Sequence, residues 1–165
     1  MGKQVEIIPA TIEDALEILA LQKLAYQSEA RIYNDWTIQP LRETAEDIRA
    51  EFNTHVFLKA VSERLLVGSV RACTMGTTCY IGKLIVHPQW QNQGIATRLI
   101  AEAEMMHRDT GRFELFTGSK SAKNIHLYHK CGYQEFRREK LNDSIELVYL
   151  EKIVPNFGKD TARCI

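Results

Sequence analysis

The sequence of 165 residues is poor in the features that mark several classes of protein. Its four cysteines form no Cys-x-x-Cys pair, which favours free thiols in a reducing compartment. Acidic and basic residues balance at 21 each, so the composition does not suggest a polyanion-binding protein. No apolar run approaches the roughly 18 residues that mark a membrane-spanning helix. We therefore expect neither nucleic acid nor a membrane as a partner.

Three local motifs are also missing. Residues 1–6 lack the apolar core of a signal peptide, so we expect a cytoplasmic protein. The chain has neither Gly-x-Gly-x-x-Gly nor a Walker lysine, which leaves a nucleotide-binding enzyme with little support. His126, His129 and Cys131 lie close in sequence, but nothing else completes a tetrahedral ligand set. We expect no metal.

What the sequence does contain is an ordinary globular composition, 45% hydrophobic and 25% charged. We see no repeat and no linker, which predicts one domain over residues 1–154 and a polar tail over 155–165. Periodicity predicts the order β-α-α-β-β-β-α-β-α-β-β. The strands are expected at 5–9, 56–61, 65–74, 80–86, 113–117, 133–141 and 145–153. The helices are expected at 12–27, 41–52, 94–108 and 124–130, with an irregular stretch over 28–40. This order predicts a mixed sheet with helices on both faces.

The most informative stretch is a strand, a turn and a helix. The strand Tyr80–Val86 stops at Pro88, because proline has no N–H for the ladder. A helix with one apolar face begins near Gly94 and includes Ile95, Leu99, Ala103 and Met106. Between them lies the sequence Gln91-x-x-Gly94-x-Ala96. A glycine-containing entry to a helix N-terminus predicts an anion site, because the first N–H groups lack partners and the dipole is positive there.

This segment resembles the acyl-CoA pyrophosphate loop of the GNAT superfamily of N-acetyltransferases, written [Arg/Gln]-x-x-Gly-x-[Gly/Ala]. The element order resembles the same fold over residues 4 to 153. The resemblance implies an α/β fold with a central, mostly antiparallel sheet of about seven strands flanked by four helices. It also implies acetyl-CoA as co-substrate. In the family the strands corresponding to Tyr80–Val86 and Phe113–Thr117 splay apart, and the cofactor sits between them.

The resemblance assigns cofactor-binding residues on this stretch. Main-chain groups before the turn would pair with the pantetheine arm, and N–H groups of the turn would meet the pyrophosphate. These residues are Leu84, Ile85 and Val86, followed by Gln91, Asn92, Gln93, Gly94, Ile95, Ala96 and Thr97. Gln91 stands where arginine is common, so a charge is missing. Arg98, Lys120 and Lys123 are candidates for replacing it, and ordinary solvated surface residues are the alternative.

The second family-like segment runs from Asn124 through Tyr128 to Gly132-Tyr133. The resemblance implies that Tyr128 is the catalytic acid that protonates the CoA thiolate, and that it lies against the cofactor. A phenol within hydrogen-bond reach can supply that proton. The alternative is that Tyr128 is a core residue with its hydroxyl at the rim. Asn124 would contact the pantetheine or cap the helix.

A general base is not evident. Many relatives carry a glutamate on the central strand, where this chain has Tyr80, Gly82 and Lys83. Lys83 cannot serve unless its pKa is depressed. Other candidates are Glu29, Asp35, His87 and a water relay, and a structural role for His87 is the alternative.

The expected acceptor is a primary amine, either of a small molecule or of a protein. Residues 26–54 hold six acidic and three basic residues, which favours a cationic substrate there unless the charges only solvate helix faces. The family builds its acceptor pocket in this region. Candidate substrate-binding residues are Glu29, Tyr33, Asp35, Trp36 and Tyr80. An ordinary loop with one packed tryptophan is the alternative.

The sequence thus predicts an acetyl-CoA-dependent N-acetyltransferase that works by direct attack in a ternary complex. A catalytically weak CoA-binding sensor or a partner-binding domain on the same fold is the alternative, because the strand carboxylate is absent. A homodimer through the last hairpin is expected from the resemblance.

Overall fold

The structure is a computed structural model that describes residues 2–158. Within these residues, seven strands form one sheet. The order is β1-β2-β3-β4-β5-β7-β6, and every neighbouring pair is antiparallel except β4 and β5. The strands are β1 Glu6–Pro9, β2 Val56–Ser62, β3 Leu65–Met75, β4 Thr78–Val86, β5 Arg112–Gly118, β6 Gln134–Lys140 and β7 Glu146–Ile153. The expected mixed, mostly antiparallel sheet is confirmed.

Six α-helices and two short 3₁₀ helices accompany the sheet within these residues. They are η1 Ile12–Asp14, α1 Ala15–Ala25, α2 Gln27–Tyr33, α3 Gln39–Arg42, α4 Ala45–Glu51, η2 Pro88–Trp90, α5 Ile95–Met106 and α6 Ala122–Lys130. Two sequence predictions need correction here. The helix expected at 41–52 is divided into α3 and α4, and the stretch expected to be irregular at 28–40 contains α2.

Local capping explains the division between α3 and α4. The Thr44 amide donates to Asp47 Oδ2 at 2.8 Å, and the Asp47 amide donates to Thr44 Oγ1 at 3.2 Å. This reciprocal pair is a capping box, which starts a new helix at Ala45. The polar composition of α2 concealed a helix that ends where Asn34 adopts a left-handed φ of 48°.

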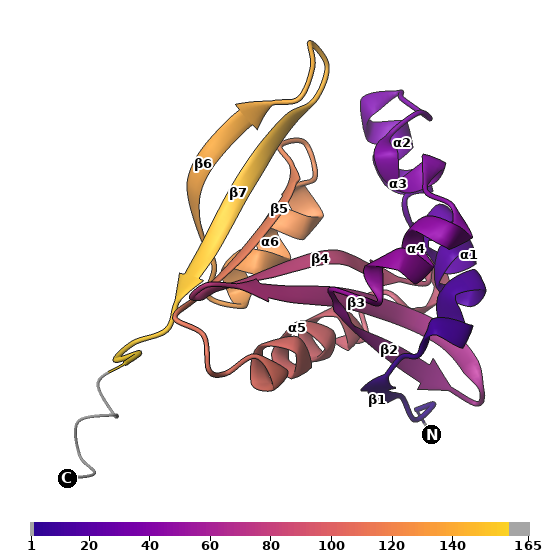
Figure 1. Ribbon diagram of the computed structural model, residues 1–165. Coiled ribbons are helices and arrows are strands. Elements are labelled where there is room, and N and C mark those ends of the chain that lie inside the picture. The colour runs from indigo at the N-terminus through magenta and orange to yellow at the C-terminus, as the bar shows by residue number, and fades with distance from the viewer. Residues whose placement is uncertain (1, 159–165) are drawn as a thin grey trace, which may run out of the picture.

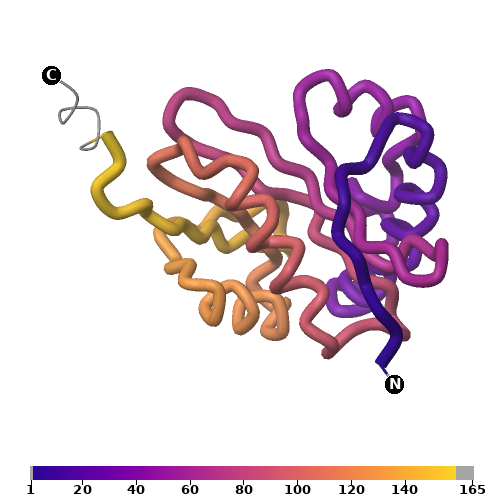
Figure 2. Tube along the Cα trace, turned by 90° about the horizontal axis from the view of Figure 1, so that it is seen from below, coloured from indigo at the N-terminus to yellow at the C-terminus, as the bar shows by residue number. Residues whose placement is uncertain are grey.

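Two apolar clusters lie on opposite faces of the sheet. One joins the sheet to α5 and α6, with Leu99 and Tyr133 among its members. The other joins β2–β4 to α1 and α4, with Ile18 and Ile48 among its members. Figure 1 shows α1–α4 beside the β1–β4 arm and α5 beneath it. Viewed from below, the N-terminus and the last described residues lie at opposite ends of the molecule (Figure 2).

Gly68 allows α5 to approach the sheet closely. A Cβ at this position of β3 would lie 3.1 Å from Leu99 Cδ1 and 3.2 Å from Ile95 Cγ2. The absence of a side chain at Gly68 is what permits this close approach. Its consequence is that the N-terminal turns of α5, which follow the Gln91–Gly94 turn, are fixed against β3.

The strands β4 and β5 separate after a short parallel contact. The ladder joins Thr78–Tyr80 to Arg112–Glu114 and goes no further, although β4 runs to Val86 and β5 to Gly118. The strands then diverge into the two arms visible in Figure 1. Residues 81–86 of β4 and 115–118 of β5 do not pair with each other, and we call these two segments the strand fork. The splaying implied by the family resemblance is present.

A bulge distorts β4 within the strand fork. Ser69 of β3 pairs with Ile85, whereas Arg71 pairs with Gly82, so β4 holds an extra residue between these pairs. Lys83 lies at this position and adopts a left-handed φ of 49°. A lysine in that conformation is uncommon and marks a place where the fold imposes the backbone.

The bulge changes which face each side chain occupies. Residues four apart on a regular strand share a face. Ile81 and Ile85 instead belong to different apolar clusters on opposite sides of the sheet. The side chain of Lys83 points toward the α1–α4 side, where its Nζ lies 3.7 Å from Glu43 Oε2.

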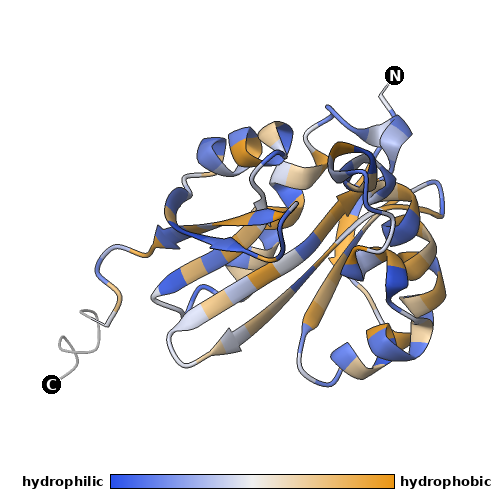
Figure 3. Ribbon diagram, turned by 90° about the horizontal axis from the view of Figure 1, so that it is seen from above, coloured by the Kyte–Doolittle hydropathy of each residue, from blue (hydrophilic) through white to orange (hydrophobic). Residues whose placement is uncertain are grey.

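The second arm consists of β5, β7 and β6. It has one covered and one open face along β5 and β7, whereas β6 is exposed throughout. Hydrophilic and hydrophobic residues alternate along its strands (Figure 3), as expected when one face packs and the other meets solvent. Phe116 and Phe136 are on the open side and are largely exposed.

None of the helices in residues 2–158 is both long and apolar enough to cross a bilayer. Cys73, Cys79 and Cys131 are free thiols, and burial raises the pKa of Cys79 to about 11. Cys164 and residues 159–165 of the expected tail lie outside the described residues.

Candidate active site

The turn between β4 and α5 leads into a helix whose first main-chain N–H groups face open space. Gly94 is the N-cap of α5, has a φ of 80° and makes no side-chain cap bond. A Cβ added at Gly94 would meet nothing within 4 Å, so the space next to the helix N-terminus is open. The first N–H groups of α5 therefore have the geometry of an anion site.

The cofactor-binding residues predicted on this stretch lie in one continuous strand, turn and helix. Ile85, Val86 and Ile95 are buried and anchor the segment. The others are half-buried or exposed, namely Leu84, Gln91, Asn92, Gln93, Gly94, Ala96 and Thr97. Ala96 is in the first turn of α5, so it has the helical backbone that a residue larger than glycine needs.

Helix α6 leaves the other side of the fork. It begins at Ala122 with Ser121 as N-cap, so Asn124 is inside the first turn, and the capping interpretation of Asn124 is wrong. Asn124 Nδ2 instead donates to Thr117 Oγ1 of β5 at 3.3 Å. Tyr128 follows one turn later on the same face of the helix.

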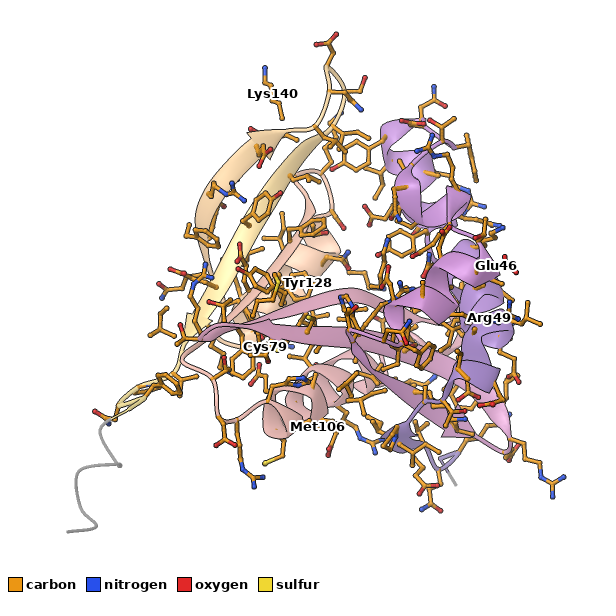
Figure 4. All side chains as sticks on the ribbon, in the orientation of Figure 1. Glu46, Arg49, Cys79, Met106, Tyr128 and Lys140 are labelled. Carbon is orange, nitrogen blue, oxygen red and sulfur yellow. The ribbon has the colours of Figure 1, made fainter. Side chains whose placement is uncertain are left out.

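Tyr128 points into the interior of the molecule, between the two arms (Figure 4). The residue is 6% exposed, and its hydroxyl has no hydrogen-bond partner among residues 2–158. Among the same residues, the Ser62 hydroxyl is the one side-chain polar atom that is both sealed from solvent and unpartnered. The Tyr128 hydroxyl must therefore face accessible space.

Burial raises the pKa of Tyr128, and the negative charge of Glu29 raises it further. Burial likewise raises the pKa of Tyr26, against the positive charge of Arg71. Both phenols consequently stay protonated and can act as hydrogen-bond donors.

Helix α2 crosses from the first arm to the second. Glu29 Oε1 accepts a hydrogen bond from Ser121 Oγ at 2.7 Å, and the Tyr33 hydroxyl accepts one from the Lys120 amide at 2.9 Å. Glu29 also contributes negative charge at both Tyr26 and Tyr128. Two of the predicted substrate-binding residues, Glu29 and Tyr33, thus lie where α2 meets the loop between β5 and α6.

The other three predicted substrate-binding residues lie elsewhere. Asp35 Oδ1 accepts bonds from the Thr37 amide at 2.8 Å and the Thr37 hydroxyl at 2.6 Å, and these bonds lower the pKa of Asp35. Trp36 is 52% exposed. Tyr80 lies on the paired part of β4, before the fork. None of the three contacts Tyr128 through any interaction within residues 2–158.

The strand residues considered as bases have structural partners. His87 Nδ1 accepts a hydrogen bond from the Gln89 amide at 3.1 Å and caps η2. Burial lowers the pKa of Lys83, while the negative charge of Glu43 opposes that shift. Lys83 also donates to Gln39 and lies over the ring of Tyr26, 5.9 Å from its centroid.

Behind Lys83 is a set of paired charges that we call the buried ion network, made of Gln22, Glu43, Glu51, Arg71 and Lys83. Arg71 Nη1 lies 3.1 Å from Glu43 Oε1 and 2.7 Å from Glu51 Oε2. Gln22 donates to Glu43 and accepts from Arg71. Burial alone would raise the pKa of Glu43, but the bond from Gln22 and the charges of Arg71 and Lys83 lower it. Each charge in the network has an opposite partner.

The acidic excess of residues 26–54 is therefore largely compensated inside the protein. Glu43 and Glu51 belong to the buried ion network, Glu46 pairs with Arg49, Asp47 caps α4 and Asp35 closes a turn. Glu29 is the acid of this set whose partner is neutral and whose charge reaches Tyr128.

A cavity of about 460 Å³ adjoins this region. It is lined by Tyr33 of α2, Ser119 and Lys120 of the loop before α6, and Lys140 with residues 142–146 of the last hairpin. Figure 4 shows Lys140 near the tip of that hairpin. The lining contains two lysines and two acids, Asp143 and Glu146, so its formal charges balance.

Sequence reasoning missed Tyr26 and the buried ion network. Tyr26, Glu29 and Tyr33 have the spacing i, i+3, i+7, which would have placed them on one helix face had α2 been predicted. Arg71 gave no local signal, because its partners Glu43 and Glu51 are 28 and 20 residues away.

Comparisons with known proteins agree with this geometry. Residues 16–133 match the acetyltransferase (GNAT) family, and the chain belongs to that family. The UPF0157 protein YqkA of Bacillus subtilis (strain 168) is 27% identical over 121 residues, which cover 73% of this chain and 35% of YqkA. The chain thus spans about a third of the length of that curated relative.

Solved structures share the fold. The PaiA N-acetyltransferase of Thermoplasma acidophilum, in complex with coenzyme A, is similar with a TM-score of 0.73 and 18% identity, over 92% of this chain and 99% of that one. The ribosomal-protein-S18-alanine N-acetyltransferase of Escherichia coli is similar with a TM-score of 0.74 and 12% identity, over 92% and 94%. At this level of identity the likeness concerns the fold.

Proposed function

We propose that this chain is an acetyl-CoA-dependent N-acetyltransferase in which the acceptor amine attacks the thioester directly, in a ternary complex. The observation that carries this function is the strand fork. It has an open helix N-terminus at the β4 side and the accessible, unpartnered hydroxyl of Tyr128 at the α6 side. Membership of the acetyltransferase (GNAT) family supports the reaction class.

The residues of the turn fit the diphosphate of CoA. The open space at Gly94 and the free first N–H groups of α5 suit an anion. Leu84, Ile85 and Val86 lie on the part of β4 that has no β5 partner, so the amides of the pantetheine arm would find main-chain groups there. Asn124 flanks the arm from α6.

Tyr128 serves as the acid. The thiolate that leaves after attack by the amine needs a proton or a hydrogen bond, and a phenol supplies either when held in reach. Burial keeps the hydroxyl protonated, because it raises the pKa of Tyr128.

Glu29 binds the acceptor. An ammonium group placed near Glu29 would neutralise a half-buried carboxylate whose present partner is the neutral Ser121 hydroxyl. The acceptor is then a primary amine, of a small molecule or of a protein, and the cavity beside Tyr33 offers room for the rest of a larger acceptor.

The test is a thiol-release assay with acetyl-CoA and a panel of amines that includes polyamines, amino-acid amides and peptides with free N-termini. The wild-type chain should release CoA with at least one class of amine well above the rate of hydrolysis. Glu29→Gln should raise KM for the amine, because it removes the charge that binds the ammonium group.

Tyr149→Phe is the matched control for Tyr128→Phe, which removes the proposed acid, since Tyr149 is an aromatic residue of β7 packed against Phe116 on the second arm. It should leave the rate unchanged. A chain that binds CoA but releases no thiol with any amine would instead be a CoA-binding domain, and the proposed activity would be wrong.

A further inference from the structure

The turn that would hold the diphosphate has no positive side chain of its own. Residues 91–97 contain no lysine or arginine, and Gln91 begins the motif. Main-chain N–H groups and a helix dipole bind phosphate, but a charge-assisted bond is roughly twice as strong as a neutral one. A cation from another part of the chain would therefore strengthen the site.

Two of the three cations suggested by the sequence are directed elsewhere. Arg98 is one turn into α5, but its Nη2 donates to the Val5 carbonyl at 2.9 Å, which ties it to the N-terminal segment. Lys120 extends over the ring of Tyr33, with its Nζ 5.7 Å from the centroid. Neither side chain forms a hydrogen bond, an ion pair or a ring contact with residues 91–97 in the described part of the chain.

Lys123 does reach the turn. It is the second residue of α6, on the far side of the strand fork, and its Nζ donates to Gln91 Oε1 at 2.8 Å. The amide of Gln91 is in turn directed to the strand, with Nε2 3.4 Å from the Val86 carbonyl. The first residue of the phosphate motif thus connects β4 with α6 across the fork.

The charge of Lys123 is not compensated within residues 2–158. No carboxylate lies within salt-bridge distance of its Nζ, whereas Lys83, Lys59 and Lys152 each pair with an acid. Its one hydrogen-bond partner is a neutral amide oxygen. An anion entering next to Gln91 would meet an exposed ammonium group that is already held in position.

We propose that Lys123 is the counter-charge of the CoA diphosphate and takes over the role of the arginine that Gln91 replaces. Helix α6 then contacts both ends of the pantetheine arm, with Lys123 at the diphosphate and Tyr128 at the sulfur. Gln91 orients the lysine in the free protein and yields its place as hydrogen-bond acceptor to a phosphate oxygen. This inference rests on the proposed function, because it assumes that the turn binds CoA.

The test is calorimetric titration of the protein with CoA, without any acceptor amine. Lys123→Met should raise the Kd for CoA about tenfold, the loss expected for one hydrogen bond to a charged group. It should also make the Kd less sensitive to salt, because one ionic contact is gone. Lys130→Met is the matched control, since Lys130 is an exposed lysine at the opposite end of α6, and it should bind CoA as the wild type does.

Two further titrations show which phosphate of CoA Lys123 contacts. Dephospho-CoA retains the diphosphate and lacks the 3′-phosphate, so Lys123→Met should weaken it by the same factor. A loss confined to CoA would place Lys123 at the 3′-phosphate and overturn the diphosphate assignment. Adding Gln91→Arg to Lys123→Met should restore most of the affinity, because the arginine returns the missing charge to the turn.

The outcomes separate this inference from the proposed function. Wild-type affinity in Lys123→Met, with normal binding by the wild type, would refute the role of Lys123 and leave the turn assignment intact. Failure of the wild-type protein itself to bind CoA would refute the proposed function, and this inference with it.

Discussion

Two sets of polar groups lie near the strand fork, and they differ in whether the protein itself satisfies them. The buried ion network on the α1–α4 side pairs Arg71 with two carboxylates and Lys83 with one, and Arg71 and Glu43 at its centre are almost sealed from solvent. The open set comprises the first amides of α5, Lys123, Glu29 and the Tyr128 hydroxyl. Its members have neutral partners or none within the described residues.

The difference indicates which groups hold the fold and which await a ligand. A buried ion whose partners are all in the protein gains nothing from a ligand, but losing one partner leaves an uncompensated charge. A polar group that faces accessible space without a partner has capacity to bind. By this criterion we interpret the buried ion network as structural, and we propose the open set as the binding and catalytic surface.

Removal of Arg71 should have the largest effect on stability. Arg71→Leu removes the cation nearest to the buried Glu43, leaves the more distant Lys83 to balance it and takes from Glu51 its ion-pair partner, and we expect the free energy of unfolding to fall by about 3–5 kcal/mol in urea denaturation. Arg49→Leu is the control, because Arg49 forms an exposed pair with Glu46 on the outer side of α4 (Figure 4). That change should cost less than about 1 kcal/mol. Equal losses of unfolding free energy in Arg71→Leu and Arg49→Leu would show that the buried and the exposed ion pairs contribute alike, and would contradict this comparison.

Removal of the Tyr128 hydroxyl should have the largest effect on turnover. We expect Tyr128→Phe to lower kcat about a hundredfold, the scale of general acid catalysis, with little change in Kd for CoA. Because the pKa of Tyr128 is raised, the wild-type rate should not fall through loss of its proton near its ordinary value of 10. A wild-type kcat in the variant would show that Tyr128 only packs the core.

Lowering the pH should destabilise the buried ion network less than removal of Arg71 does. The pKa of Glu43 is lower in the folded protein than its ordinary value of 4.5, so the folded state binds fewer protons than the unfolded state. This contribution is complete above pH 4.5 and is lost as the pH falls through the folded pKa. Below pH 4.5, the free energy of unfolding should therefore fall less steeply with decreasing pH in Glu43→Gln than in the wild type.

The exposed Glu102 of α5 supplies the comparison for the acid experiment. Glu102→Gln should keep the wild-type dependence on pH, because this carboxyl has no partner to lose among residues 2–158. If both variants followed the wild type, Glu43 would not contribute to acid unfolding.

The smallest effect is expected from Lys123→Met on stability. An exposed lysine with a neutral partner contributes little, so the free energy of unfolding should change by no more than about 0.5 kcal/mol. The same variant should still lose affinity for CoA. A large loss of stability would place Lys123 with the structural charges and contradict its assignment to the open set.

Much of the fold followed from the sequence because its signals are local. The strand end before Pro88 and the glycine entry to α5 both depend on single residues whose backbone needs are known. The same holds for the phosphate turn, whose motif and helix start lie within seven residues. Tyr128 was found because a resemblance, not its own chemistry, singled it out.

The features that could not be predicted from the sequence depend on residues that are distant along the chain. The pairing of Arg71 with Glu43 and Glu51, the bulge at Lys83 and the choice of Lys123 over Arg98 are each set by where other elements lie. The absence of α2 from the prediction had the widest consequence, since it separated Tyr26 from Glu29 and Tyr33. Polar helices supported by tertiary contacts carry little apolar periodicity.

The central claim is that the turn at Gly94 is where this protein binds CoA, and one titration tests it directly. Gly94 and Gly76 both have positive φ, of 80° and 61°, and at both a Cβ would meet nothing within 4 Å. Gly94→Glu and Gly76→Glu therefore impose similar backbone strain and add the same charge, but only the first places it at the N-terminus of α5. We predict that Gly76→Glu binds CoA with the wild-type Kd and that Gly94→Glu shows no binding. Wild-type affinity in Gly94→Glu would contradict the account.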